Sequence, residues 1–243
     1  DDPSSLPFLN PPRANDVAQT QKLLCQIGAL DAHNRITDHG RALARHPVHV
    51  RLAHMVAKGG PDAPILAALL ENRDPLPRTA PSDLSLRVAA VKDARKFAQD
   101  HPYVANSAAL KTIRNDAKRL KSVGKDLSLA ETLALAYPDR IGLRRKGDAP
   151  RFVLSGGKGA IFDLSDPFGA ARLIVAPDLD GDAQEAKVRL ALQISQSELA
   201  NIYGDRFETV DLCHWSKRER KVIARSQTQF GALVLEDRHW KNC

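Results

Sequence analysis

The fold is decided first by residues 15–57, which read NDVAQTQKLLCQIGALDAHNRITDHGRALARHPVHVRLAHMVA. An amphipathic helix is predicted between Asn15, a residue suited to cap a helix N-terminus, and Gly28, a residue type that commonly follows a helix end. Apolar residues recur within it at mostly helical spacing, at Val17, Leu23, Leu24 and Ile27. The stretch therefore opens on a helix with both ends marked.

The remainder of this stretch predicts a small wing and two further helices. Residues 29–35 form a short extended piece and a polar turn. Thr37 or Asp38 can cap a second helix that runs through Leu43. A third helix, over residues 48–57, follows a His-Pro pair and carries a mostly apolar face. Helix, small wing, helix, helix is the layout of a winged-helix module.

Helical patterns continue to residue 136. The first of these segments is apolar on almost all sides, which indicates a helix buried on several faces. The last begins with Ser128 and Glu131, whose spacing is that of a capping box. Together these segments predict a helical bundle, with helices over residues 64–72, 82–97, 106–122 and 128–136.

The periodicity changes at Tyr137, after which the chain is strand-like. Aliphatic and β-branched residues alternate between turns, and one short helix is predicted at 197–203. The predicted strands are 171–176, 186–194, 206–215, 221–225 and 232–235. Several strands with one short helix suit a small Greek-key β-barrel of the OB type.

The fold class is accordingly α+β and multidomain. A linker or strap rich in proline and serine precedes the first module. The predicted divisions are 1–12 for the strap, 13–58 for the winged helix, 59–136 for the helical bundle and 137–243 for the OB-type barrel.

Composition is that of an ordinary globular protein and is compatible with a polyanionic partner, although many basic proteins bind none. The 243 residues are 43% hydrophobic and carry a formal net charge of +7. No apolar run approaches the roughly 20 residues of a membrane span, so no membrane partner is expected. Three cysteines without a C-x-x-C pair indicate neither a disulfide framework nor a zinc site, and they favour a reducing, cytoplasmic setting. The only methionine is Met55, so we expect the chain to be part of a longer protein.

Positive charge is concentrated between residues 111 and 151, where eleven Lys or Arg stand against five acids. Such side chains neutralise phosphates and release counterions, which gives affinity without sequence preference. Few aromatic rings are close, only Tyr137, Phe152 and Phe162, so contacts to the phosphate backbone should dominate over base stacking. The candidate nucleic-acid-binding residues are Lys111, Arg114, Lys118, Lys121, Arg140, Arg144, Arg145, Lys146, Arg151 and Lys158.

The sequence shows no complete catalytic or metal-binding motif. The stretch 155–159, SGGKG, is the nearest approach to a phosphate-binding loop, but it lacks the first glycine and the final Ser or Thr, and a tight hairpin is the better interpretation. The acidic stretch 178–182 lacks the glycine and glutamate of a calcium loop and indicates a polar turn. His46, His49 and His54 lack a completing carboxylate, so capping or surface roles are predicted.

Several short motifs follow one another in a fixed order: LPFLNPP at 6–12, IGALD at 27–31, IT followed by Gly40 and Ala44, HPVHVRLA at 46–53, and AYPDRI with a following Arg pair at 136–145. Their order and spacing resemble those of DEAH-box helicases, and specifically the HrpB group of ATP-dependent helicases. The departures from the pattern are Asn10 and His49, where the family usually has Asp.

The resemblance implies that the chain is the accessory region that follows the motor: winged helix, ratchet bundle and OB fold. These modules would grip single-stranded nucleic acid, which the resemblance implies is RNA, while RecA-like motor domains outside this segment hydrolyse ATP with Mg²⁺. No D-E-A-H tetrad occurs here, so this segment should not be catalytic alone and should hold no cofactor. Candidate contacts with the motor are Phe8, Pro11, Pro12 and Arg51.

Two other classes of function remain open at this point. A winged-helix DNA-binding transcriptional regulator with an attached β domain would place the third helix in a major groove, although that helix offers few base-edge donors besides Arg51 and His54. An adaptor that binds only protein would show no salt-sensitive affinity for nucleic acid.

Overall fold

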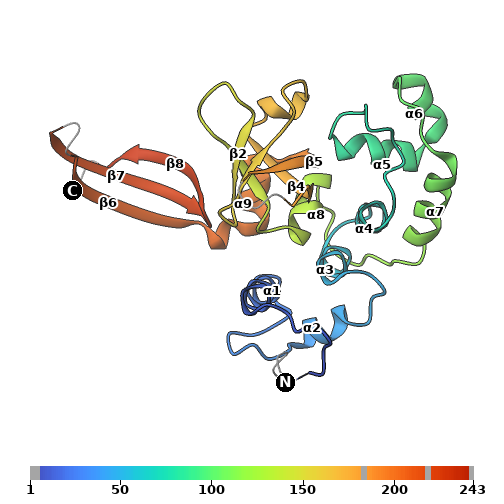
Figure 1. Ribbon diagram of the computed structural model, residues 1–243, viewed down its shortest axis with the longest axis horizontal. Coiled ribbons are helices and arrows are strands. Elements are labelled where there is room, and N and C mark those ends of the chain that lie inside the picture. The colour runs from blue at the N-terminus through green and yellow to red at the C-terminus, as the bar shows by residue number, and fades with distance from the viewer. Residues whose placement is uncertain (1–5, 182–184, 217–219, 241–243) are drawn as a thin grey trace.

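The computed structural model describes residues 6–181, 185–216 and 220–240 (Figure 1). Its first module contains α1 (Ala14–Gln26), α2 (Asp38–Leu43) and α3 (Val50–Lys58). The short piece between α1 and α2 folds back on itself through a bridge between Leu30 and Ile36. Thr37 caps α2, because its hydroxyl accepts a hydrogen bond from the backbone N–H of Gly40 at 3.0 Å. The three predicted helices and the extended piece between them are therefore present.

The start of α1 differs from the prediction. The helix begins at Ala14, and the residue before it, Arg13, makes no capping hydrogen bond through its side chain. Asn15 lies inside the first turn, where its side chain cannot cap the helix. Pro12, two residues before the helix, is compatible with this earlier start, because proline does not disturb a helix that begins after it.

The helical bundle consists of α4 (Ala63–Glu71), α5 (Leu84–Lys92), α6 (Ala94–Asp100), α7 (Ser107–Ala117) and α8 (Leu129–Ala136). The predicted capping box at the start of α8 is confirmed: the Ser128 hydroxyl accepts from the Glu131 N–H, and the Glu131 carboxylate accepts from the Ser128 N–H. Five residues of α4 are buried, as its apolar sequence predicted. One hydrophobic core joins the bundle to α3 and to the first barrel strand.

Two predicted helices were too long. The segment 82–97 is broken at Asp93, whose carboxylate accepts hydrogen bonds from the N–H groups of Arg95 and Lys96 and so caps α6 as a new helix. Aspartate competes with a continuous helix in this way because its short side chain reaches nearby backbone donors. The segment 106–122 is helical only to Ala117, so Lys118 and Lys121 do not belong to α7.

A closed five-stranded barrel follows, so a barrel is present as predicted, but only two of its strands were among those predicted from the alternating sequence, 171–176 and 186–194. Its strands are β1 (Ile141–Arg144), β2 (Arg151–Leu154), β3 (Gly159–Ile161), β4 (Leu173–Leu179) and β5 (Glu185–Gln193), in the order β1-β2-β3-β5-β4. Neighbouring strands are antiparallel except β3 and β5, which run parallel. The 3-10 helix η2 (Pro167–Ala170) lies between β3 and β4. A separate core built around Phe152 fills the barrel.

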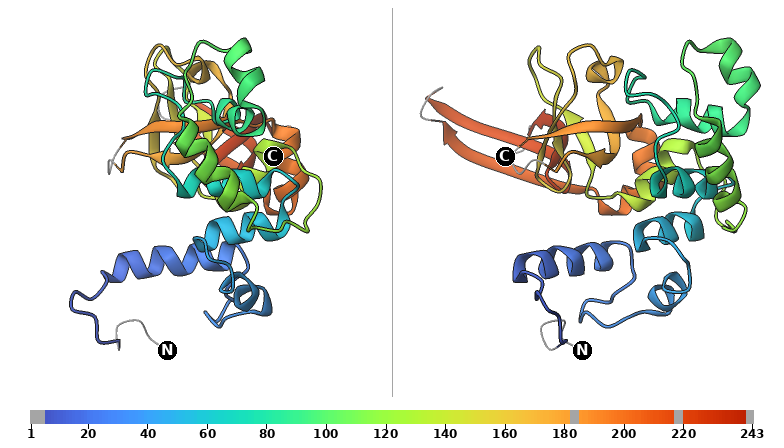
Figure 2. Two further views of the ribbon diagram at one scale, coloured as in Figure 1. Left: turned by 90° about the vertical axis from the view of Figure 1, so that its right-hand side faces the viewer. Right: turned by 45° about the vertical axis from the view of Figure 1, so that its right-hand side comes forward.

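The last strands do not join the barrel, which corrects the prediction of a single β-domain over 137–243. After α9 (Gln196–Tyr203) and the 3-10 helix η3 (Gly204–Arg206), β6 (Glu208–Ser216), β7 (Lys221–Phe230) and β8 (Leu233–His239) form their own antiparallel sheet. This sheet extends away from the barrel as an arm (Figures 1 and 2). It is anchored at its base, where Arg172 donates to the Leu235 carbonyl at 2.7 Å.

Candidate nucleic-acid interface

The three modules meet at a partly buried ion pair. Arg51 of α3 donates two hydrogen bonds to the carboxylate of Asp139, from Nη1 at 2.7 Å and from Nη2 at 2.9 Å. Its Nη1 also donates to the Ala136 carbonyl at the end of α8, at 3.0 Å. The Tyr137 ring lies near two guanidinium groups, at 5.3 Å from that of Arg51 and 5.2 Å from that of Arg140. The motif AYPDRI thus forms an internal junction between α3, the end of α8 and the start of the barrel.

Electrostatics at this junction favour the charged pair. Burial acts to raise the pKa of Asp139, but the hydrogen bonds and charge of Arg51 outweigh it, so the pKa lies below its ordinary value. Arg140 also points inward, since its Nη1 donates to the Pro177 carbonyl at 2.6 Å. Arg51, a candidate for contacting the motor, and Arg140, a candidate for binding nucleic acid, therefore have partners within the chain.

The other candidate motor contacts are accessible. Phe8 is 51% exposed, and Pro11 and Pro12 are exposed as well. Leu9 beside them is 95% exposed. The exposed apolar side chains of this strap are available to pack against another surface.

Four of the candidate cations gather on the β1–β2 hairpin of the barrel. The backbone holds the hairpin, because the Arg145 N–H donates to the Arg151 carbonyl at 2.8 Å. Arg144 is turned toward η2, where its Nε donates to the Gly169 carbonyl at 2.7 Å. Arg151 forms a partly exposed ion pair with Glu185 at 3.2 Å. Arg145 and Lys146 are exposed in the connecting loop, so this hairpin presents positive charge to solvent.

The bundle cations lie elsewhere. Figure 1 shows α7 at the edge of the molecule opposite the arm, with the barrel between them. Arg114 serves the bundle itself, since its guanidinium donates to the carbonyls of Val91 and Ala90 near the end of α5. Lys111, Lys118 and Lys121 are exposed there. The structure thus divides the predicted set into a bundle group and a barrel group.

Lys158 occupies a third position. It ends the turn between β2 and β3, at the opposite end of β2 from the β1–β2 loop. The predicted hairpin at SGGKG is confirmed: the Leu154 N–H donates to the Lys158 carbonyl, and Gly157 adopts a positive φ of 93°. This turn leads into a strand rather than a helix, so its residues do not fit a nucleotide-phosphate loop.

A hollow of about 690 Å³ lies between bundle and barrel, but none of the ten candidate cations lines it. Its ionisable residues are of both signs, and several are already paired, such as Asp74 with Arg87 at 3.0 Å. Burial raises the pKa of Asp178 on its wall, although the nearby charge of Arg189 opposes the effect. The mixed charge of this hollow does not favour a polyanion.

The aromatic rings predicted nearest to the cations are all buried. Tyr137, Phe152 and Phe162 have exposed fractions of 8%, 0% and 3%, so they cannot stack on bases. Sequence reasoning missed Trp215, which is 60% exposed on the arm. The signal that could have revealed it is the cationic sequence SKRERK that follows directly at 216–221.

The histidines and acidic residues have structural roles where they are described. The His49 ring caps α3 by accepting from the Arg51 N–H, as predicted. His54 is buried, so the surface or capping role predicted for it is wrong, and its Nδ1 lies 2.8 Å from Nε2 of the partly buried His39. Burial, with the charges of His39 and Lys58, lowers the pKa of His54 to about 3.

In the predicted turn at 178–182, the Asp180 carboxylate accepts from the Lys187 N–H, while Asp182 lies outside the described residues. Among the described residues no cluster of three or more His, Cys, Asp or Glu is arranged to hold a metal ion, and no helix is long and apolar enough to span a membrane.

Comparison with known proteins identifies relatives along the entire chain. The ATP-dependent RNA helicase HrpB of Escherichia coli strain K12 is 27% identical over 242 residues, which cover 97% of this chain and 28% of the relative. No protein-family model matches the chain. The chain therefore spans less than a third of the length of this relative.

Two solved structures share the fold. The crystal structure of the E. coli DExH-box NTPase HrpB has a TM-score of 0.77 and 27% identity, and it covers 100% of this chain with 29% of its own length. A crystal structure of the E. coli DEAH/RHA helicase HrpB has a TM-score of 0.72 and 24% identity with the same coverage, and it supports the fold alone. The predicted resemblance to the HrpB group is confirmed in sequence and in fold.

Proposed function

We propose that the chain is the accessory region of an HrpB-like ATP-dependent helicase, and that it grips single-stranded RNA while motor domains outside this segment hydrolyse ATP with Mg²⁺. The observation that carries the proposal is the match along 97% of the chain to a protein described as an RNA helicase. A fold match over the complete chain, at a TM-score of 0.77, supports it.

Within this proposal each module has a part. Residues 13–58 serve as the winged helix, residues 59–136 as the ratchet bundle, and the barrel as an OB fold. The arm β6–β8 is an addition to the barrel. The exposed strap residues Phe8, Pro11 and Pro12 contact the motor. Arg51 is left out of that contact, because its guanidinium is bound to Asp139. The parent protein would act in the cytoplasm.

Strand binding in this proposal is centred on the β1–β2 hairpin. Its exposed cations can each neutralise a phosphate, and an OB-type barrel characteristically carries a basic groove for a single strand. The separated bundle group, Lys111, Lys118 and Lys121, would contact the strand only at another point along its path. Because the barrel rings are buried, binding there should show little base preference.

The competing transcriptional regulator is disfavoured by the burial of α3. A recognition helix must present side chains to base edges in the major groove. In α3, however, residues 52–56 are all buried, and the helix packs against α8 and α4. Of the two base-edge donors expected from the sequence, Arg51 is held by Asp139 and His54 is buried.

Charge reversal on the hairpin tests the proposal. We expect the triple variant R144E/R145E/K146E to bind a fluorescein-labelled 12-residue oligouridine severalfold more weakly than the unmodified chain at moderate salt, as measured by fluorescence anisotropy. The matched control is the exposed α1 cation in Lys22→Glu, which should bind normally. Unchanged affinity of the triple variant, with an unchanged circular dichroism spectrum, would remove the hairpin from the strand path.

A further inference from the structure

The arm ends its sheet on a long edge strand, β6. All nine residues of β6 pair with β7 in unbroken antiparallel register, and β6 pairs with no other strand in the part of the chain that is described. The barrel is closed, so its strands have no such edge. The outer side of an edge strand carries a row of backbone N–H and C=O groups that can pair with a further strand.

The two edges of the arm are protected differently. Proteins guard an open edge with lysine, proline or a β-bulge. The sequence of β6, ETVDLCHWS, contains no lysine or proline, and its pairing with β7 has no register shift. The other edge strand, β8, pairs irregularly with β7 beside Thr228, and its base is held to the barrel by the hydrogen bond from Arg172 to the Leu235 carbonyl. Only β6 is therefore left ready to pair.

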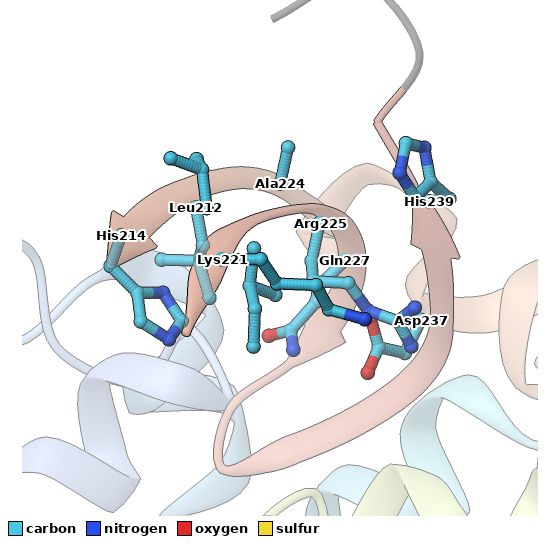
Figure 3. A pocket seen from close by; sticks show the side chains of 10 residues that line it. Leu212, His214, Lys221, Ala224, Arg225, Gln227, Asp237 and His239 are labelled. Atoms are coloured by element: carbon cyan, nitrogen blue, oxygen red, sulfur yellow. The ribbon is translucent and has the colours of Figure 1, made fainter. Parts of the chain in front are cut away.

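Apolar side chains flank the β6 edge on both faces of the sheet. Leu212 is 37% exposed and Trp215 is 60% exposed, and alternation along the strand places them on opposite faces. On the face of Leu212, the side chains of Leu212, His214 and Lys221 line a hollow of about 540 Å³ (Figure 3). On the other face, Val222 lies directly opposite Trp215 and is 57% exposed. A strand added to this edge would remove apolar surface from water on both faces.

Charge is divided along the arm. Glu208 and Asp211 lie on the half of β6 that is nearer the barrel. Arg220 and Lys221 lie at the far end, where β7 begins, and both are exposed. Two such arms placed side by side in antiparallel sense bring the acidic end of each beside the cationic end of the other, whereas a parallel arrangement brings like charges together. The arm is therefore complementary to a second copy of itself.

We infer that β6 pairs with β6 of a second copy of this chain, in antiparallel sense, so that two three-stranded arms form one six-stranded sheet. Closed two-fold dimers of this kind use the same surface on both copies and are the commonest oligomers. Leu212 is the middle residue of the strand, so a two-fold axis between the two Leu212 residues pairs all nine residues of each copy. The inference does not depend on the proposed function.

This register gives the exposed side chains specific neighbours. Trp215 of one copy lies opposite Thr209 of the other, and an aromatic ring opposite a β-branched residue is a stabilising pair. Glu208 lies opposite Ser216 of the second copy, and Ser216 is itself opposite Lys221 on β7. Directly opposite residues share a face, and two strand spacings span only about 10 Å. The Glu208 carboxylate of one copy can therefore approach the Lys221 ammonium of the other across the small serine.

A strand of a different protein could also pair with an open edge. The second copy is favoured because its strand supplies both properties that the edge requires, apolar side chains at the centre and charges of opposite sign at the ends. Pairing with a different strand is therefore treated as an outcome that would overturn the inference.

Sedimentation velocity of the complete chain at increasing concentration tests the pairing. One strand pair is a small interface, so we expect a weak dimer that forms in the high micromolar range. Leu212→Lys removes an apolar pair and places two like charges opposite each other, which should weaken the dimer about tenfold. The matched control is Val234→Lys on β8, because Val234 has the same exposed fraction as Leu212, 37%, but lies away from the β6 edge. This control should dimerise normally.

Two further measurements locate the interface. Glu208→Lys and Lys221→Glu should each weaken the dimer severalfold, and the double variant should recover it, because the exchanged charges meet again between the copies. In hydrogen exchange followed by mass spectrometry, the backbone amides of residues 208–216 should become more protected as concentration rises, while those of residues 233–239 should not.

The outcomes are distinct from those that test strand binding. A chain that stays monomeric at every concentration would overturn the inference, as would a dimer that Leu212→Lys leaves intact or that Val234→Lys weakens equally. A double charge variant no stronger than the single variants would overturn the antiparallel pairing. None of these results changes the proposed function, which is measured by oligouridine affinity. Circular dichroism of each variant establishes that its fold is intact.

Discussion

The Arg51–Asp139 pair offers the most informative perturbation of the fold. The substitution Asp139→Asn keeps the size of the side chain but removes the negative charge that accepts two hydrogen bonds from Arg51. The Arg51 side chain is only 12% exposed, so its guanidinium would be left near Tyr137 with no compensating charge. We therefore expect the junction of the three modules to be weakened.

The magnitude follows from the burial of the two partners. Breaking a fully buried ion pair from one side costs about 3–5 kcal/mol. Asp139 is 31% exposed, so water can replace part of what Arg51 loses, and we expect a loss of about 2–3 kcal/mol. For a chain of this size each kcal/mol lowers the melting temperature by about 2–4 °C. The variant should therefore melt about 4–12 °C lower.

Urea denaturation followed by circular dichroism measures this loss, and a second ion pair provides the control. Asp163→Asn removes the partner of Lys187, in a pair whose side chains are 64% and 49% exposed. Such a surface pair contributes about 0–1 kcal/mol. The two substitutions make the same chemical change, so the difference between them reports the buried environment of Asp139.

The pH dependence has a definite sign. Because the pKa of Asp139 is lower in the folded chain than in the unfolded chain, its stabilising contribution is present above the unfolded value of about 3.9 and is lost as the pH falls through the folded value. The difference in unfolding free energy between the unmodified chain and Asp139→Asn should be constant near neutral pH and should shrink below about pH 4. A loss at pH 7 no larger than that of Asp163→Asn would refute the reasoning.

Two further substitutions test roles assigned above. His54 has a folded pKa of about 3, so between pH 6.5 and 3 the unfolded chain binds a proton that the folded chain excludes. As the pH is lowered through that range, the unfolding free energy should therefore fall by about 1 kcal/mol per pH unit. In urea titrations His54→Gln should show a smaller dependence of unfolding free energy on pH. An equal dependence in both proteins would contradict the burial of a neutral ring. Arg114→Met should destabilise the chain by about 1–2 kcal/mol, because two carbonyls at the end of α5 lose their donor, and it should leave oligouridine affinity nearly unchanged. Lys111→Met, an exposed change on the same helix, is its control for stability, and equal stability of the two variants would assign Arg114 to the surface.

Local signals in the sequence predicted much of the fold. The Ser128–Glu131 capping box and the Thr37 cap were readable because each depends on residues within one helical turn. The closing turn at Gly157 was readable for the same reason. Asp93 was missed because an aspartate inside an apolar helical period can either face solvent or cap a new helix, and tertiary packing decides between them.

The tertiary arrangement was less accessible. Strand patterns identify β6, β7 and β8, but whether they pair with the barrel or with one another depends on long-range pairing that alternation does not encode. Charge counting likewise grouped Arg114 with Lys146, although Arg114 bonds to α5 and Lys146 lies on the barrel hairpin. Cations close in sequence were therefore separated by the fold.

The most direct test of the central claim is the salt dependence of oligouridine binding by the complete chain. Single-strand binding through cations predicts that log K falls linearly with log salt, with a slope that decreases by about 2 in magnitude when Arg144, Arg145 and Lys146 are all changed to Ala. It also predicts that polyuridine competes better than duplex DNA. A salt-independent or absent affinity, or a duplex of defined sequence that outcompetes polyuridine, would contradict the account.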